Sequence, residues 1–136
     1  MNFEDLQVGM EASLTKTITL EDTQTYAQLS GDKNPVHTDP DAAAQAQFKK
    51  PIAHGLLTAS LFSAIFGEKL PGPGSIYISQ SLIFKRPVYV GDAITATVTL
   101  ERLDSKKSRA FFRTICKTRG RLAIDGEAEI YLPNPG

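Results

Sequence analysis

Hydrophobic positions along this 136-residue chain repeat with two different periods, and each period predicts one kind of element. Residues 12–18 alternate apolar with mainly polar side chains, which is typical of a half-buried strand. Thr19 and Asp22 then have the spacing of a capping box, so a short helix is expected to begin there. Gly31 is suited to end this helix because glycine readily adopts a left-handed conformation.

The next segment predicts a second short helix followed by a longer, buried one. Asp39 is a good N-cap, and Pro40 suits the first helical position of a helix that ends before Pro51. Residues 55–69 are apolar around most of the helical circumference, so this helix must be buried on most sides.

Four strand-like runs complete the chain, at residues 76–84, 94–100, 109–117 and 122–130. Their short connections indicate antiparallel neighbours. With the first strand they predict a five-stranded antiparallel sheet that wraps around the buried helix. This is an α+β arrangement that matches the hot-dog fold, with the loop and short helices inserted as an overhang. Without a linker or internal repeat, residues 1–136 are expected to form a single domain.

Composition narrows the functional classes. Fifteen basic and fifteen acidic residues give a net charge of zero, which argues against nucleic-acid binding. Cys116 is the only cysteine, so no internal disulfide is possible, and a buried structural thiol is expected. The longest uncharged apolar stretch, residues 55–67, is too short to cross a bilayer, and the first residues lack a signal-peptide core. We therefore expect a soluble, cytoplasmic protein with no membrane partner.

The densest group of chemically useful side chains lies at residues 30–37. Asp32, Asn34 and His37 fall within six residues, and Pro35 favours an extended Asn34 in an irregular loop. A carboxylate beside an imidazole can hold and polarise one water molecule. A structural interpretation stays open, in which Asp32 caps a turn and His37 lies on the surface.

A second candidate lies where the buried helix begins. The helix has no Ser, Thr, Asp or Asn at its expected N-cap, so its first amide groups are available to a negatively charged oxygen. Gly55 would let such an oxygen approach the backbone as in an oxyanion hole, or it would serve only tight packing. His37 and His54, taken with Asp32 or Asp39, lack a metal-binding spacing, so no metal site is expected.

Four segments of this chain resemble the MaoC-like hydratase family. They read SGDKNPVH at residues 30–37, PIAHG at 51–55, LPGPGSIY at 70–77 and FKRPV at 84–88. The resemblance is strongest to the small R-specific enoyl-CoA hydratases. It implies a hydro-lyase that reversibly adds water in syn geometry to trans-2-enoyl-CoA, giving (R)-3-hydroxyacyl-CoA.

The resemblance also implies residue roles. Asp32 and His37 would hold the water between them, without deciding which is the acid and which the base. Asn34 would position the water or the loop, and the amide of Gly55 would bind the thioester oxygen. No cofactor is expected, because coenzyme A is part of the substrate. The family further implies a homodimer.

The acyl chain and the phosphates of coenzyme A need their own contacts. Phe62, Ser63 and Phe66 lie on neighbouring positions of the buried helix and are expected to wall the acyl pocket. Phe66 would limit the pocket to short and medium chains. Lys85 and Arg86 are either solvated or in contact with the phosphates.

Three other functions remain open. A dehydratase acting on carrier-protein thioesters would use the same motif. A hot-dog thioesterase shares the expected fold but does not need the string at residues 34–37. A non-catalytic acyl-binding subunit would typically lack the acid and base. The sequence does not separate fatty-acid metabolism from polyhydroxyalkanoate supply.

Overall fold

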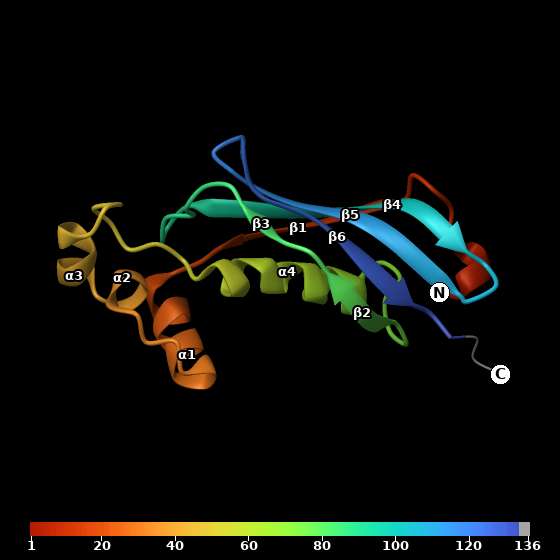
Figure 1. Cartoon of the computed structure of the whole chain (residues 1–136), viewed down its shortest axis with the longest axis horizontal. Helices are drawn as coiled ribbons and strands as arrows, with labels where there is room; N and C mark the ends of the chain where they lie inside the picture. The colour runs from red at the N-terminus through yellow and green to blue at the C-terminus, as the bar shows by residue number, and fades with distance from the viewer. Residues whose placement is uncertain (134–136) are drawn as a thin grey trace.

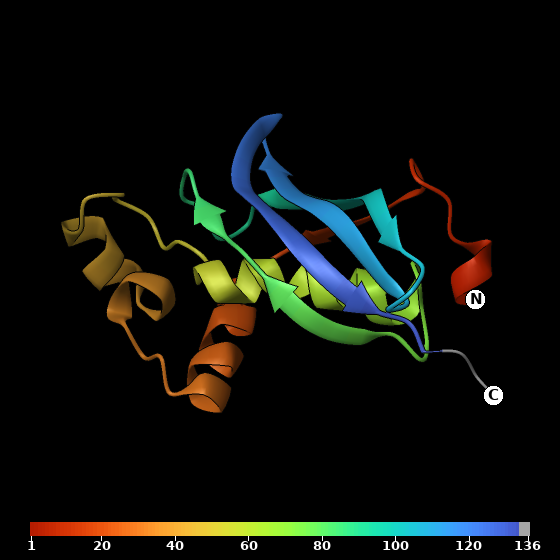
Figure 2. The same ribbon diagram turned by 45° about the vertical axis from the view of Figure 1, so that its right-hand side comes forward.

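The computed structural model describes residues 1–133 and shows one long helix lying against a curved sheet (Figure 1). The elements in chain order are η1 (Phe3–Asp5), β1 (Glu11–Thr17), α1 (Leu20–Ser30), α2 (Pro35–Thr38), α3 (Pro40–Gln45), α4 (Gly55–Glu68), β2 (Ile76–Gln80), β3 (Ile83–Phe84), β4 (Ala93–Asp104), β5 (Arg109–Thr118) and β6 (Arg121–Tyr131). The sheet curves over α4, and α1, α2 and α3 gather beyond the N-terminal end of that helix (Figure 2). None of the helices within residues 1–133 has the length and apolar character needed to span a membrane.

The sheet is antiparallel throughout, with the order β1-β4-β5-β6-β2, and β3 also pairs with β6. This confirms the α+β hot-dog arrangement but corrects the strand count from five to six. The predicted strand at 76–84 is divided into β2 and β3. Ser81 lies between them and packs on Gly126, where an added Cβ would be 1.9 Å from the Ser81 carbonyl oxygen. A glycine in β6 therefore allows the break.

The core lies between α4 and the inner face of the sheet. Phe62, Ile65 and Phe66 are at most 2% exposed, and Phe66 meets Phe112 of β5 edge to face at 4.9 Å. Each such side chain contributes roughly 1.5–3 kcal/mol by leaving water. The other side of α4 is open in a single chain, where Leu56 is 62% exposed. The helix is therefore buried on one side only, which is less than its composition predicts.

The predicted alternation holds best in the central strands. The apolar residues of β4 between Ile94 and Leu100 are buried, as expected. In β6, a register shift at Cys116/Lys117 of the neighbouring strand places Ala123 in the core instead of Leu122. Cys116 is buried as predicted, and burial raises the pKa of its thiol to about 12, so it is not a thiolate nucleophile near neutral pH.

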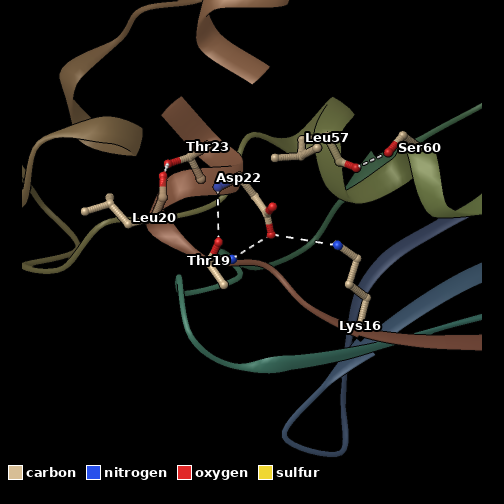
Figure 3. A network of polar contacts seen from close by, with 7 residues as sticks. All are labelled: Lys16, Thr19, Leu20, Asp22, Thr23, Leu57 and Ser60. Carbon is tan, nitrogen blue, oxygen red and sulfur yellow. Dashed lines mark hydrogen bonds and ion pairs between the residues drawn. The ribbon is translucent and has the colours of Figure 1, made fainter. Parts of the chain in front are cut away.

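The overhang begins with the predicted capping box (Figure 3). The amide of Asp22 donates to Thr19 Oγ1 at 3.1 Å, and the amide of Thr19 donates to the Asp22 carboxylate at 3.0 Å. These hydrogen bonds lower the pKa of Asp22, and Lys16 lies 3.9 Å from the same carboxylate. Gly31 ends α1 with φ 83°, as its freedom from a side chain permits.

One local prediction was wrong. Pro35 does not prevent helix formation; it occupies the first turn of the four-residue helix α2, where its missing N–H costs nothing. Asn34, with φ −56° and ψ 120°, serves as the N-cap. His37 therefore projects from a short helix and not from an irregular loop, while Asp32 precedes that helix.

Candidate active site

Residues 30–34 form a tight loop whose polar groups bond mainly to one another. The amide of Asp32 donates to Ser30 Oγ at 3.1 Å, and Asp32 Oδ1 accepts from the amide of Asn34 at 3.3 Å. Asn34 Oδ1 in turn accepts from the amide of Val36 at 3.2 Å, which caps α2. Asp32 thus does cap a turn, and the Asn34 side chain holds the loop.

His37 is held at one ring nitrogen, and no side chain or backbone group of residues 1–133 forms a hydrogen bond with the other. Its Nδ1 lies 2.6 Å from the carbonyl oxygen of Ile52. Because a carbonyl oxygen only accepts, Nδ1 carries the proton and Nε2 of the neutral ring has a free lone pair. The amide of Ile52 also donates to the Val36 carbonyl at 3.2 Å, which ties α2 to residue 52. A half-buried, oriented imidazole with a free lone pair is suited to act as a base.

His54 lies behind His37, and sequence reasoning considered it only as a metal ligand. It is 2% exposed, its ring stacks on that of His37 with centroids 4.0 Å apart, and its Nε2 lies 3.1 Å from the Asp32 carbonyl oxygen. Burial lowers the pKa of His54 from 6.5, although the hydrogen bond to Asp32 acts in the opposite direction. The one feature of the sequence that could have indicated a role for His54 in the site is its position directly before a helix without a capping side chain.

Asp32, His37 and His54 each bring a ligand-type atom into one cluster, with all three atoms within 4.8 Å of one another. A water molecule that hydrogen-bonds at about 2.8 Å to each of two groups can bridge such a distance. Among residues 1–133 these are also the side chains best placed to hold a metal ion. However, the two rings are only 28° from parallel, so their in-plane lone pairs do not converge at the roughly 2.0 Å that zinc requires.

The N-terminus of α4 faces the same region. His54 precedes the helix and its side chain makes no capping hydrogen bond, and Thr58 is the first residue whose amide bonds back, to the His54 carbonyl at 3.0 Å. The earlier amides, including that of Gly55, are therefore suited to bind an oxygen that gains negative charge. Phe84 packs directly on Gly55. Both interpretations of this glycine thus have structural support.

These groups line a cavity of about 570 Å³, within the range of small-molecule sites. It is lined by Tyr26, Asp32, His37, Phe48, Ile52, Ala53, His54, Gly55, Leu56, Thr58, Phe84, Lys85, Arg86, Pro87, Val88 and Ile124. Lys85 and Arg86 line this cavity, and their contact with the coenzyme A phosphates stays a prediction.

The predicted acyl-pocket residues are placed differently. Phe62 and Phe66 are in the core, Ser63 is exposed on α4, and none of the three lines the cavity. The helical periodicity that grouped them carries no information about which side of α4 faces a ligand. Tyr26 of α1 and Phe48, which lies in the turn after α3, line the cavity from the overhang. Sequence reasoning missed both because neither belongs to a recognisable motif.

The sequence matches the MaoC-like domain family over residues 4–126. The chain belongs to this family. The match covers the overhang, the buried helix and most of the sheet, so every residue of the candidate site lies within the MaoC-like domain.

Two curated relatives and one solved structure place this MaoC-like domain more closely. An (R)-specific enoyl-CoA hydratase from Rhodospirillum rubrum is 48% identical over 134 residues, covering 98% of this chain and 93% of the relative. A mitochondrial 3-hydroxyacyl-[acyl-carrier-protein] dehydratase from Arabidopsis thaliana is 41% identical, covering 95% of this chain and 79% of the relative. The solved (R)-hydratase from Aeromonas caviae, described as involved in PHA biosynthesis, superposes with a TM-score of 0.94 at 47% identity, covering 96% of this chain and 99% of that one.

Proposed function

We propose that this MaoC-like domain is an (R)-specific enoyl-CoA hydratase that reversibly adds water to trans-2-enoyl-CoA. The observation that carries the proposal is the meeting of Asp32 and His37 in a cavity beside the uncapped start of α4. The similarity of this chain to curated (R)-specific enoyl-CoA hydratases, over nearly its full length, supports the same reaction.

In the proposed mechanism, Asp32 and His37 hold one water molecule above C3 of the substrate. As the water oxygen bonds to C3, His37 Nε2 accepts a proton from that water. The π electron pair moves toward the thioester, whose oxygen gains enolate character. C2 then takes one proton from the Asp32–His37 pair on the same face. The elements of one water molecule have been added, and the pair returns to its starting protonation. No metal ion takes part in these proposed steps.

The start of α4 stabilises the charge that develops on the thioester oxygen. An amide N–H at a helix N-terminus offers both a hydrogen bond and the positive end of the helix dipole. Gly55 presents its amide without a side chain, so the oxygen can approach closely. Removing one such donor typically costs about 10²- to 10³-fold in rate, so this contact matters as much as the base.

Coenzyme A gives the substrate its charged end. Arg86 donates from Nε to the Leu122 carbonyl at 2.8 Å, which fixes its guanidinium near Lys85 in the cavity wall. A neighbouring cavity of about 480 Å³ shares Arg86 and is also lined by Arg121 and by Arg119, which is ion-paired with Asp92 at 2.9 Å. This basic rim supports binding of the coenzyme A phosphates. The preference for short and medium acyl chains was based on Phe66. Because Phe66 does not line the cavity, this preference stays a prediction.

The proposal includes a homodimer. β2 and β3 lie at one edge of the sheet and carry five large exposed apolar side chains, with exposures of 38–60%. These are Ile76, Tyr77, Ile78, Ile83 and Phe84. An apolar strand edge invites pairing, and a second copy would cover both this edge and the open side of α4. We also place the enzyme in the cytoplasm, where its single thiol would stay reduced.

The test is to follow loss of the enoyl-thioester absorbance when purified protein is added to crotonyl-CoA, with release of free thiol measured in parallel. The proposal predicts loss of absorbance without thiol release. Thiol release would indicate the thioesterase alternative. No reaction with crotonyl-CoA, but turnover of an enoyl carrier protein, would favour the dehydratase alternative that the Arabidopsis relative represents.

A further inference from the structure

His54 contacts both members of the proposed water-holding pair, and it does so through different parts of its ring. Nε2 lies 3.1 Å from the backbone oxygen of Asp32, and the ring face stacks on His37 at 4.0 Å. On another side, the ring meets Tyr26 edge to face with centroids 4.6 Å apart. At 2% exposure His54 has little freedom to move.

The hydrogen bond to Asp32 fixes which nitrogen of His54 carries a proton. A carbonyl oxygen only accepts, so the donor is Nε2–H and a neutral ring has no proton on Nδ1. Burial favours the neutral ring by lowering the pKa of His54. Nδ1 is buried and has no hydrogen-bond partner within the described part of the chain. Packing alone does not explain a buried acceptor without a partner, because leaving it unpaired is costly.

The loop that carries Asp32 has few other anchors. Among the side-chain hydrogen bonds of residues 1–133 that involve Asp32, the one from His54 alone comes from outside residues 30–34. His37 is anchored to the Ile52 carbonyl, two residues before His54. The amide of Ala53, between them, donates to the Val88 carbonyl at 2.8 Å. One short segment, residues 52–54, therefore ties both halves of the pair to the body of the domain.

We propose that His54 is a positioning residue that sets the distance and orientation between the Asp32 carboxylate and His37 Nε2. Its N–H holds the Asp32 loop, and its ring face fixes the plane of the His37 imidazole. This inference rests on the proposed hydratase function, because it concerns the geometry of the water that the pair holds. A neutral ring suits this task, because a second positive charge would oppose proton uptake by His37.

Two substitutions separate the hydrogen bond from the ring. His54→Phe keeps a ring that can stack on His37 but has no donor, whereas His54→Gln retains an amide N–H that can reach the Asp32 carbonyl. Displacing a reacting group by about 1 Å can cost about 10²-fold in rate. We therefore expect His54→Phe to lower kcat on crotonyl-CoA by about 10- to 100-fold with KM changed less than about threefold, and His54→Gln to recover most of that loss.

Thr23→Val is the matched control for lost stability. Thr23 is fully buried in α1, and its hydroxyl donates to the Leu20 carbonyl at 2.7 Å within the same helix. This variant should lower the melting temperature and leave kcat unchanged. A His54→Phe enzyme with the kcat of Thr23→Val would overturn the inference. A rise in KM at constant kcat would also overturn it, because His54 would then act in substrate binding.

Activity of the wild-type protein separates failure of this inference from failure of the proposed function. If the proposed function is wrong, the wild-type protein will not hydrate crotonyl-CoA at all. If His54→Phe does not fold, nitrogen-15 NMR of the histidine side chains in the wild-type protein provides a second test, because it shows which ring nitrogen is protonated. The inference predicts a proton on Nε2 of His54 and none on Nδ1. A proton on Nδ1 with none on Nε2 would leave no donor for the Asp32 carbonyl and would overturn the inference.

Discussion

Phe84 lies directly on Gly55, so closely that a Cβ added to this glycine would be 2.6 Å from Phe84 Cε1 and 2.9 Å from Cδ1. The aromatic ring of a sheet residue thus covers the Cα at the start of α4, beside the amide proposed to bind the thioester oxygen. Two roles for Gly55, packing and catalysis, therefore meet at one position. An added methyl group would force this half-exposed ring outward and break its contact with the start of α4.

Gly55→Ala separates these roles when it is combined with Phe84→Ala. We expect Gly55→Ala to lower stability by about 1–3 kcal/mol through overpacking and to lower kcat/KM by at least about tenfold. In the double variant the lost stability should return because the ring is absent, but the rate should not. The reference is Phe84→Ala alone. If the double variant matches this reference in kcat/KM, Gly55 is required for packing only.

Asp32 and His37 are expected to act as one unit. Asp32→Asn and His37→Gln should each lower kcat by about 10²- to 10⁴-fold, because each removes one of the two groups that hold the water. The double variant should be little worse than either single one, since groups that act together are not additive. Thermal unfolding serves as the check on structure. Multiplicative losses in the double variant would mean that the residues act independently.

The pH dependence of stability should report the burial of His54. Burial lowers its pKa in the folded chain, whereas the unfolded chain titrates near 6.5. Above that pH both states are neutral and there is no penalty. As the pH falls below about 6.5, the unfolded state binds a proton that the folded state excludes, so stability decreases by at most about 1.4 kcal/mol per pH unit. His54→Gln should lose less stability than wild type between about pH 7.5 and about pH 5.5. Equal losses would contradict a lowered pKa.

The exposed edge formed by β2 and β3 should mediate assembly. Light scattering at low micromolar concentration is expected to give about twice the chain mass of 14.8 kDa. Ile78→Lys places a charge on this edge and should shift the protein toward the monomer. Val8→Lys is the matched control, because Val8 is also exposed, at 61%, but lies outside the sheet. A fully active wild-type monomer would contradict the dimer.

Much of the architecture could be predicted from the sequence because it depends on local patterns. The capping box at Thr19 and the alternation in β4 both act within a few residues, and both were confirmed. The break between β2 and β3 was missed because its cause, the contact of Ser81 with Gly126, joins residues distant in the chain. The exposure of the apolar residues in the 76–84 segment also depends on more than local pattern. An apolar pattern shows that a face avoids water, but it does not show whether the same chain or a second copy covers it.

The site was predicted in part. Asp32, Asn34 and His37 are close in sequence, so their grouping needed no tertiary information. His54 lies near them because residues 52–54 run beside α2, where Ile52 forms hydrogen bonds with Val36 and His37. These contacts join residues about 15 positions apart, so no local pattern predicts them. Phe66 lies in the core and does not line this cavity, and its predicted contact with the acyl chain stays a prediction. Its helical position is regular, but the side of α4 that faces the cavity is determined by how the sheet packs on it.

The configuration of the product tests the central claim most directly. Purified protein would be incubated with crotonyl-CoA, and the 3-hydroxybutyryl product would be resolved on a chiral column after removal of coenzyme A. In the proposed mechanism the water is delivered to one face of the double bond, and the chain is similar to (R)-specific hydratases, so we predict only the (R) product. The (S) product or a racemic mixture would contradict it, as would crotonyl-CoA recovered unchanged.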